Sequence, residues 1–132
     1  MKYRYKQYSP GIIRPVIPIE IIYKNTAVPY EVLIDSGADM NIFDAQLVEI
    51  LALDLTSGKS ARVAGITGME ERYFLHTLDL KVGGHLLKNV EVGFLSNIGQ
   101  YGYGVVGQKG FFDRFVVRFD FQKEEIELTL RE

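Results

Sequence analysis

The sequence predicts an all-β, barrel-like fold with two short helices. Short runs of alternating apolar residues recur along the chain, for example over 14–23 and 117–130. Thirteen glycines, together with polar turn formers, separate these runs. Helical spacing of apolar residues occurs only near 44–53 and 110–115. Many short strands with little helix are typical of a closed or partly open β barrel.

Length and composition indicate one globular domain over 1–132. The chain is 47% hydrophobic and 24% charged, as expected for a soluble protein. It has no cysteine, which excludes disulfides, thiolate nucleophiles and cysteine-based zinc sites. The net charge of −2 argues against nucleic acid or an anionic membrane as a partner. Without a signal core or a long apolar run, we expect a cytoplasmic protein.

The N-terminal residues 1–11 allow two interpretations. Three basic residues alternate with tyrosines, which is compatible with an arm that stacks on single-stranded nucleic acid. The same pattern is compatible with an edge strand or a loose terminus. The net acidity of the chain favours the second interpretation. The residues concerned are Lys2, Tyr3, Arg4, Tyr5 and Lys6.

A hairpin is predicted over 14–34. Alternating apolar residues mark a first strand over 14–23 and a second over 28–34, and Lys24-Asn25-Thr26 forms the turn. The second strand ends at Asp35. Beyond it, helical spacing predicts a helix over 44–53 with Asp44 as its N-cap.

The stretch 60–82 predicts a second hairpin, whose tip contains two glycines. It is either a plain surface hairpin or a flexible cover over a cleft. A strand is predicted over 89–95. His76 is expected in a strand with its ring hydrogen-bonded, and the two histidines form no metal-ligand pattern.

The C-terminal third predicts a loop, a short apolar step and a closing hairpin. Residues 96–104 form the loop, and Val105-Val106-Gly107 is the step. Three phenylalanines over 110–115 suit one helical turn that buries aromatic surface. Strands over 117–121 and 126–130 form the last hairpin.

The candidate for chemistry is Asp35-Ser36-Gly37, at the end of an apolar, β-branched run. A strand end holds a reactive group rigidly, and glycine allows the backbone to turn beside it. Taken alone, however, Asp, Ser and Gly are also ordinary turn residues. The surrounding pattern therefore has to decide between a catalytic acid and an ordinary turn.

The ordered set of these features over about residues 12–130 resembles the retropepsin-like aspartic proteases, in particular the small single-domain forms of bacteria. Its marks are the strand leading into Asp35-Ser36-Gly37-Ala38, the glycine-containing hairpin at 60–82 and the step at 105–107. The short helix through 110–115 and a final strand pair complete the pattern.

This resemblance implies a homodimer. Aspartic proteolysis needs two carboxylates, yet the chain contains no second Asp-Ser-Gly or Asp-Thr-Gly sequence. In the family each chain contributes one aspartate to a site on a two-fold axis, so Asp35 is expected to face its own copy. The two carboxyls would share a proton and activate a water, with neither metal nor cofactor.

The resemblance also implies roles for the neighbouring residues. Ser36 would hydrogen-bond across the dimer, and Gly37 would leave room for the backbone of an extended peptide or protein substrate. Ala38 and Asp39 would line the adjoining pocket, while Val106 and Gly107 would support the loop. The hairpin tip would be a flap that closes over the substrate, formed by Ala64, Gly65, Ile66, Thr67, Gly68 and Met69.

Three positions depart from the family pattern. Viral members carry an arginine after the late glycine, paired with the acid that corresponds to Asp39, whereas this chain has Gln108. The expected brace is therefore missing or supplied by another residue, of which Arg114 is one candidate. Asn41 stands where threonine is frequent, and Met40 makes the adjoining pocket more apolar.

Two other functions remain open at this point. One is a peptide-binding module of the same fold that cuts poorly because it is monomeric. The other is a β-barrel that binds a small molecule, in which Asp35 is an ordinary turn acid.

Overall fold

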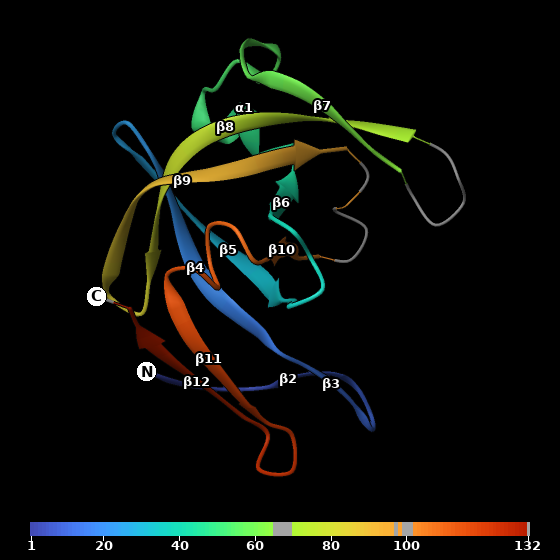
Figure 1. Cartoon of the computed structure of the whole chain (residues 1–132), viewed down its shortest axis with the longest axis vertical. Helices are drawn as coiled ribbons and strands as arrows, with labels where there is room; N and C mark the ends of the chain where they lie inside the picture. Colours follow the sequence, from blue (N-terminus) through green and yellow to red (C-terminus); the bar gives the residue numbers. More distant parts are fainter. Residues whose placement is uncertain (65–69, 97, 99–101, 132) are drawn as a thin grey trace.

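A seven-stranded sheet forms the body of the protein in the computed structural model, which describes residues 1–64, 70–96, 98 and 102–131 (Figure 1). In spatial order its strands are β4 (Val16–Tyr23), β5 (Thr26–Ile34), β10 (Gly104–Val106), β6 (Asn41–Asp44), β9 (His85–Leu95), β8 (Glu70–Val82) and β7 (Lys59–Ala64). Pairing of β4 with β8 closes the first six of these described strands into a barrel. The predicted all-β barrel is confirmed.

Apolar side chains fill the barrel. Phe43 of β6 is fully buried and packs edge-to-face on Tyr30, at 5.2 Å between ring centroids, and on Phe94, at 6.3 Å. Edge-to-face packing suits the aromatic quadrupoles and adds to the free energy gained from burial. Alternating residues of β4 and β5 face the same core, as their sequence period predicts. The barrel interior is therefore a packed core.

The order of the three strands around β10 determines where the chain must turn. β10 is parallel to β5, with Val106 opposite Ile34, and antiparallel to β6, with Val105 opposite Ile42. β5 and β6 are consecutive in the sequence but are separated in the sheet by β10. The segment 35–40 therefore has to cross the end of β10.

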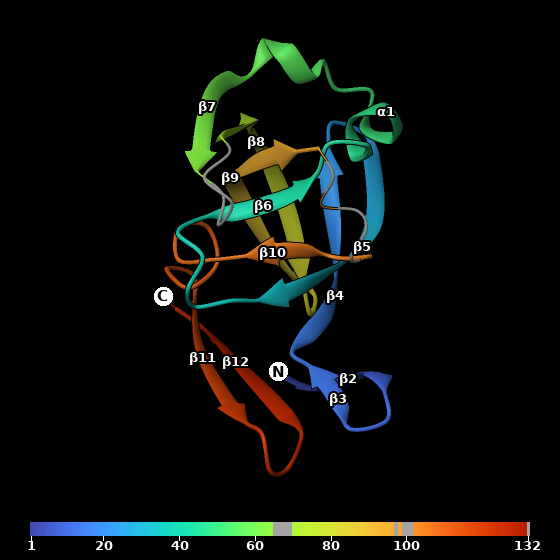
Figure 2. The same cartoon turned by 90° about the vertical axis from the view of Figure 1, so that its right-hand side faces the viewer.

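A second sheet and a separate hairpin project below the barrel (Figure 2). The sheet has the order β1 (Lys2–Arg4), β12 (Glu125–Leu130) and β11 (Phe115–Asp120), and the hairpin consists of β2 (Lys6–Ser9) and β3 (Ile12–Arg14). The Met1 ammonium donates to the Leu128 carbonyl at 2.9 Å. Of the two interpretations for residues 1–11, the structure supports the edge strand.

The predicted helix over 44–53 is wrong at its start. The helix α1 comprises only Leu47–Leu51, and Asp44 is the last residue of the strand β6. The Asp44 Oδ1 accepts a hydrogen bond from the Gln46 N–H at 3.0 Å, so this carboxylate closes the turn before the helix instead of capping it. A 3₁₀ turn, Leu55–Ser57, follows. The sequence did not predict β6, because a four-residue strand containing asparagine has no clear period.

Two other boundaries differ from the predictions. Residues 110–114 form turns that are not assigned as a helix, although the Phe115 N–H donates to the Phe111 carbonyl at helical spacing, over 3.0 Å. The strand predicted over 89–95 begins earlier, at His85. Within this strand, the backbone of Asn89 has a φ of 56°, in the left-handed region. The Asn89 N–H donates to the Asp79 Oδ1 at 3.0 Å, so a side-chain contact stabilises this irregularity.

The remaining predicted elements match the structure. Both strands of the 14–34 hairpin, the arms of the 60–82 hairpin and the closing hairpin form where expected. The predicted loop over 96–104 lies partly outside the described residues. No helix in the described part of the chain is long and apolar enough to cross a membrane.

The buried phenol of Tyr30 makes the free energy of unfolding depend on pH in the alkaline range. Burial raises the pKa of its phenol from 10.0 to about 12. The folded state therefore holds this proton more tightly than the unfolded chain does. The stabilisation is fully present below about pH 10 and is lost as the pH rises toward 12.

We expect the free energy of unfolding of Tyr30→Phe to fall less steeply than that of the parent as the pH rises above 10. At neutral pH the variant should lose about 0.5–1.5 kcal/mol, because the Asp44 N–H loses its acceptor, the Tyr30 hydroxyl, at 3.3 Å. Urea unfolding at several pH values, at one protein concentration, measures both effects. Equal slopes of unfolding free energy against pH in the two proteins would contradict the assignment.

Candidate active site

Asp35 is held at the end of β5 by backbone hydrogen bonds on both sides. Its N–H donates to the Val106 carbonyl of β10 at 3.0 Å, and the preceding Ile34 N–H donates to the Pro15 carbonyl at 2.9 Å. Val32 and Ile34 are buried in the core, which anchors the strand that carries the acid. The backbone of Asp35 is therefore rigid although its side chain is only half-buried.

The turn after β5 orients the carboxylate. The Gly37 N–H donates to the Asp35 Oδ1 at 2.8 Å, and the Ala38 N–H donates to the Asp35 carbonyl at 3.1 Å. These contacts define a side-chain-stabilised turn. Among the described residues no hydrogen bond reaches the Asp35 Oδ2. One carboxylate oxygen is thus fixed, while the other is open to a substrate, a water or a second carboxyl.

The segment 35–41 is hydrogen-bonded to the segment that follows β10. The Gln108 N–H donates to the Ala38 carbonyl at 2.9 Å, and the Lys109 N–H donates to the Asp39 carbonyl at 3.0 Å. A Cβ on Gly107 would lie 2.5 Å from the Ala38 carbonyl oxygen and 2.7 Å from that of Met40. Only glycine allows the two backbones to approach so closely.

Asn41 completes this connection from inside the protein. Its side chain is fully buried, and its Oδ1 accepts a hydrogen bond from the Gly107 N–H at 3.0 Å. Its Nδ2 points to the Glu91 carbonyl at 3.5 Å. Asn41 therefore satisfies a buried backbone donor that would otherwise lack a partner. Sequence reasoning noted Asn41 only as a departure, and the available signal was one polar residue within an apolar run.

Among the described residues no cation pairs with Asp39, so the charge-assisted brace of viral members is missing here, and a different contact joins the two segments. Gln108 itself connects the two segments, because its Nε2 donates to the Ser36 carbonyl at 3.0 Å. Arg114 does not replace the arginine of viral members, since its Nη2 donates to the Lys88 carbonyl at 3.2 Å. A neutral amide therefore braces the loop through its backbone instead of an arginine through Asp39.

A pocket of about 380 Å³ opens at the loop that follows β5, and Asp35 is not among its lining residues. The loop contributes the three predicted residues Gly37, Ala38 and Asp39, while Tyr73 of β8 and Leu95 of β9 were missed. These two lie on strands remote in sequence, and only the sheet order brings them to the loop. The pocket is lined by Gly37, Ala38, Asp39, Met40, Ile42, Tyr73 and Leu95.

The predicted flap lies mostly outside the described residues. Ala64 is the last residue of β7 and is paired with Glu70 of β8, whereas 65–69 are not among the described residues. The paired arms of the hairpin extend beyond the barrel on the side where the loop after β5 lies (Figure 1).

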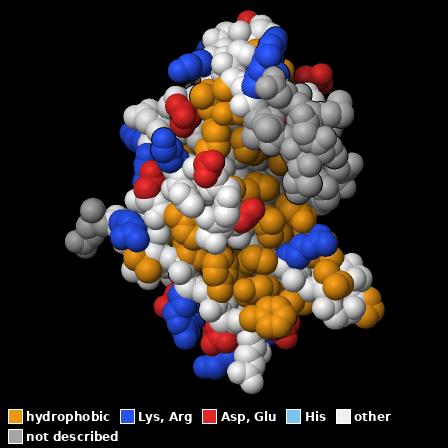
Figure 3. Space-filling view, turned by 45° about the vertical axis from the view of Figure 1, so that its right-hand side comes forward, with side chains coloured by type: hydrophobic (Ala, Val, Ile, Leu, Met, Phe, Trp, Pro, Cys, Tyr) orange, Lys and Arg blue, Asp and Glu red, His pale blue; other side chains and the backbone are white. Residues whose placement is uncertain are grey.

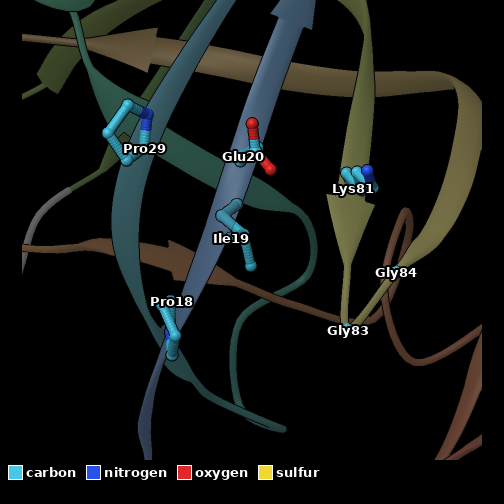
Figure 4. A pocket seen from close by; sticks show the side chains of 7 residues that line it. All are labelled: Pro18, Ile19, Glu20, Pro29, Lys81, Gly83 and Gly84. Carbon is cyan, nitrogen blue, oxygen red and sulfur yellow. The ribbon is translucent and has the colours of Figure 1, made fainter.

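A second concavity, of about 330 Å³, lies on the outer surface of the barrel (Figure 4). It contains no residue of the loop after β5. Glu20 and Lys81 are the charged side chains at this concavity and are opposite each other in the β4–β8 pairing. It is lined by Pro18, Ile19, Glu20, Pro29, Lys81, Gly83 and Gly84.

The described residues contain no cluster of three His, Asp or Glu side chains able to hold a metal ion. The His76 Nε2 lies 2.8 Å from the Leu55 carbonyl, and the ring packs edge-on to Phe94. His76 thus has the structural role that was predicted.

Comparison with known proteins agrees with this arrangement. A protein-family model described as aspartyl protease matches residues 18–109, which is more than half of the chain. The chain belongs to the aspartyl protease family. Within the matched range lie Asp35, the arms of the 60–82 hairpin and Gly107. No curated protein matches the chain in sequence.

Solved structures share the fold of this aspartyl protease. The crystal structure of a retropepsin-like aspartic protease from Rickettsia conorii is similar over 97% of this chain and 89% of that one, with a TM-score of 0.70 and 21% identity. The EIAV protease in complex with the inhibitor HBY-793 is similar over 78% and 88%, with a TM-score of 0.54 and 20% identity. The fold is retropepsin-like.

We predict that Asn41→Leu, which has nearly the same shape, destabilises the protein by about 1–3 kcal/mol, because the buried Gly107 N–H loses its acceptor. Chemical denaturation measures this change. Ile42→Val, at the half-buried neighbouring position, is the control and should cost about 0.5–1.5 kcal/mol at most. An Asn41→Leu protein as stable as the parent would show that this hydrogen bond is dispensable.

Proposed function

We propose that this aspartyl protease is an endopeptidase that hydrolyses peptide bonds with a water activated by Asp35 and Asp35 of a second copy. The observation that carries the proposal is the Asp35 carboxylate, held by the Gly37 N–H on one oxygen and unengaged on the other. A rigid, half-exposed acid at a strand end is suited to proton transfer.

The chemistry requires a second carboxyl, which a homodimer supplies. The chain contains one Asp-Ser-Gly sequence, and a two-fold axis beside Asp35 would pair this residue with its copy. Two carboxyls in contact share one proton, a behaviour for which aspartic proteases are the standard case. The ionised acid takes a proton from the water, while the protonated one hydrogen-bonds the scissile carbonyl.

The proposed substrate is a peptide or an unfolded protein segment in extended conformation. Such a segment binds as an added strand, so that main-chain hydrogen bonds set its register and pockets select its side chains. The pocket at the loop after β5, with Met40, Ile42 and Leu95 in its lining, would favour an apolar substrate side chain. Ala64–Met69 would close over the bound segment as the flap.

Asp35→Asn should abolish hydrolysis of an unfolded protein pool, with a loss of at least about a thousandfold in kcat/KM. Asp44→Asn makes the same chemical change outside the loop, keeps an oxygen to accept from Gln46, and should retain activity. Sedimentation of both variants separates lost chemistry from lost assembly. Equal product from Asp35→Asn and the parent would remove Asp35 from catalysis.

The pH dependence of kcat/KM should be bell-shaped. Activity needs one carboxyl of the pair ionised and the other protonated, so it must fall at both ends of the pH range. Initial rates of peptide cleavage, at a protein concentration where the dimer persists, measure the profile. A rate that stays constant from about pH 4 to about pH 9 would contradict the shared-proton mechanism.

A further inference from the structure

We propose that Gly93 of β9 determines the size of the substrate side chain that the pocket at the loop after β5 admits, and that this side chain is a large apolar one. The inference rests on the proposed function, because it names the side-chain preference of that site. Gly93 acts through Met40, Ile42 and Tyr73, three lining side chains that meet over it.

Gly93 lies on the face of β9 that is turned toward the pocket. Its neighbours Val92 and Phe94 are 0% and 1% exposed and belong to the barrel core. Because side chains alternate along a strand, Gly93 and Leu95 share the opposite face, and Leu95 lines the pocket. Gly93 is buried although it does not face the core. Side chains from neighbouring strands therefore cover it.

Strand pairing brings the covering side chains to Gly93. This residue is opposite Ile42 of β6 on one side and opposite Leu75 of β8 on the other. A Cβ added here would lie 2.9 Å from the Tyr73 Cδ2, 3.0 Å from the Ile42 Cδ1 and 3.2 Å from the Met40 Cε. Carbon atoms that are not bonded prefer separations of about 3.5–4.0 Å. A methyl group at this position would therefore displace all three side chains.

The displaced side chains would move into the pocket. All three line it, and the backbone of β9 lies on their other side. A glycine inside a strand often marks a place where another group approaches the backbone closely. Here the missing side chain of Gly93 lets three lining residues pack down onto the strand, which leaves the pocket deeper than any other residue would.

The size and lining of the pocket suit a large apolar side chain. Its volume is about 380 Å³, whereas a buried cavity of about 150 Å³ already accommodates benzene. Met40, Ile42 and Leu95 supply aliphatic surface. The ring of Tyr73 adds an aromatic wall, and among the described lining residues only Asp39 carries a charge. A phenyl or isobutyl group would therefore bury more apolar surface here than a methyl group would.

The surface around the candidate site has the same character. In Figure 1 the loop after β5 extends to the right-hand side of the molecule. Figure 3 brings this side forward and shows hydrophobic side chains gathered over the middle of the view. An extended substrate lying there would meet apolar surface on the way to the pocket.

Binding of non-cleavable peptides tests the proposal without hydrolysis. The probes are hydroxyl-bearing peptide isosteres with alanine on both sides of the central hydroxyl, in which phenylalanine replaces the alanines one at a time. In the parent, phenylalanine at one position should lower Kd at least about tenfold, and Gly93→Ala should remove this gain. Isothermal titration calorimetry measures both constants. The same gain in the two proteins would overturn the proposal.

Gly84→Ala is the matched control. It adds the same methyl group in the turn between β8 and β9, where a Cβ would meet no atom within 4 Å. Its φ of 86° strains any residue other than glycine, so this variant also loses stability, which urea unfolding measures. The gain from phenylalanine should nevertheless be that of the parent. An equal loss of the gain in Gly84→Ala and Gly93→Ala would overturn the proposal.

The double variant Gly93→Ala/Ile42→Val tests whether Gly93 acts through its neighbours. Valine lacks the Cδ1 that the new Cβ would meet at 3.0 Å, so the double variant moves a methyl group instead of adding one. It should regain at least about threefold of the lost preference, as expected for a volume-conserving exchange. If Gly93 served only the fold, the second substitution would restore no preference. Failure of both Gly93 variants to fold would also overturn the proposal.

Cleavage of an unfolded protein pool separates this inference from the proposed function. Mass spectrometry identifies the residues around the cleavage sites of the parent and of Gly93→Ala. Cleavage with the same preference in both would overturn the role of Gly93 and leave the proposed function standing. A parent that binds the phenylalanine isostere in a manner dependent on Gly93 but cleaves nothing would support the inference and overturn the function. A parent that neither binds nor cleaves would overturn both.

Discussion

The position of Asp35 depends on the hydrogen bonds between the segment 35–41 and the residues that follow β10. Backbone bonds from Gln108 and Lys109, the Gln108 amide on Ser36 and the buried Asn41 side chain on Gly107 all act on the same short loop. Because β10 lies between β5 and β6, the loop crosses the strand end to which it is bonded. A turn sequence that would be mobile on a surface is thereby held in one orientation, which is the condition for positioning a catalytic acid.

The same constraint explains the departures from viral relatives that the sequence contains. Where those relatives carry an arginine, an amide suffices here, because Gln108 needs only to donate to a carbonyl at the loop surface. Asn41 supplies an acceptor from the interior, and it does so without burying a charge. Neutral hydrogen bonds therefore hold the loop.

If a second copy completes the proposed site, then activity and dimerisation are linked, and the active fraction depends on protein concentration. Within one chain, strand β1 pairs with β12, and β2 pairs with β3.

Sequence reasoning was strongest where the pattern is local. Alternating residues located the 14–34 hairpin and the closing hairpin, and the run into Asp35 placed the acid at a strand end. It failed at 41–44, because a four-residue strand containing Asn41 shows no alternating pattern. It also failed at Asp44, which was predicted to cap a helix but whose side chain instead closes the turn before it. It missed Tyr73 and Leu95, whose places in the pocket at the loop after β5 follow from strand pairing and from no nearby motif.

The sequence by itself determined the β-rich character of the chain and the strand end at which the Asp35 carboxylate lies. These follow from side-chain alternation and from the position of the one Asp-Ser-Gly sequence. Only the tertiary structure decided that Gln108 and Asn41 hold the loop, through contacts that span 72 and 66 residues. Such contacts depend on the order in which strands enter the sheet, and that order is set by packing of the whole core instead of by any local run of residues.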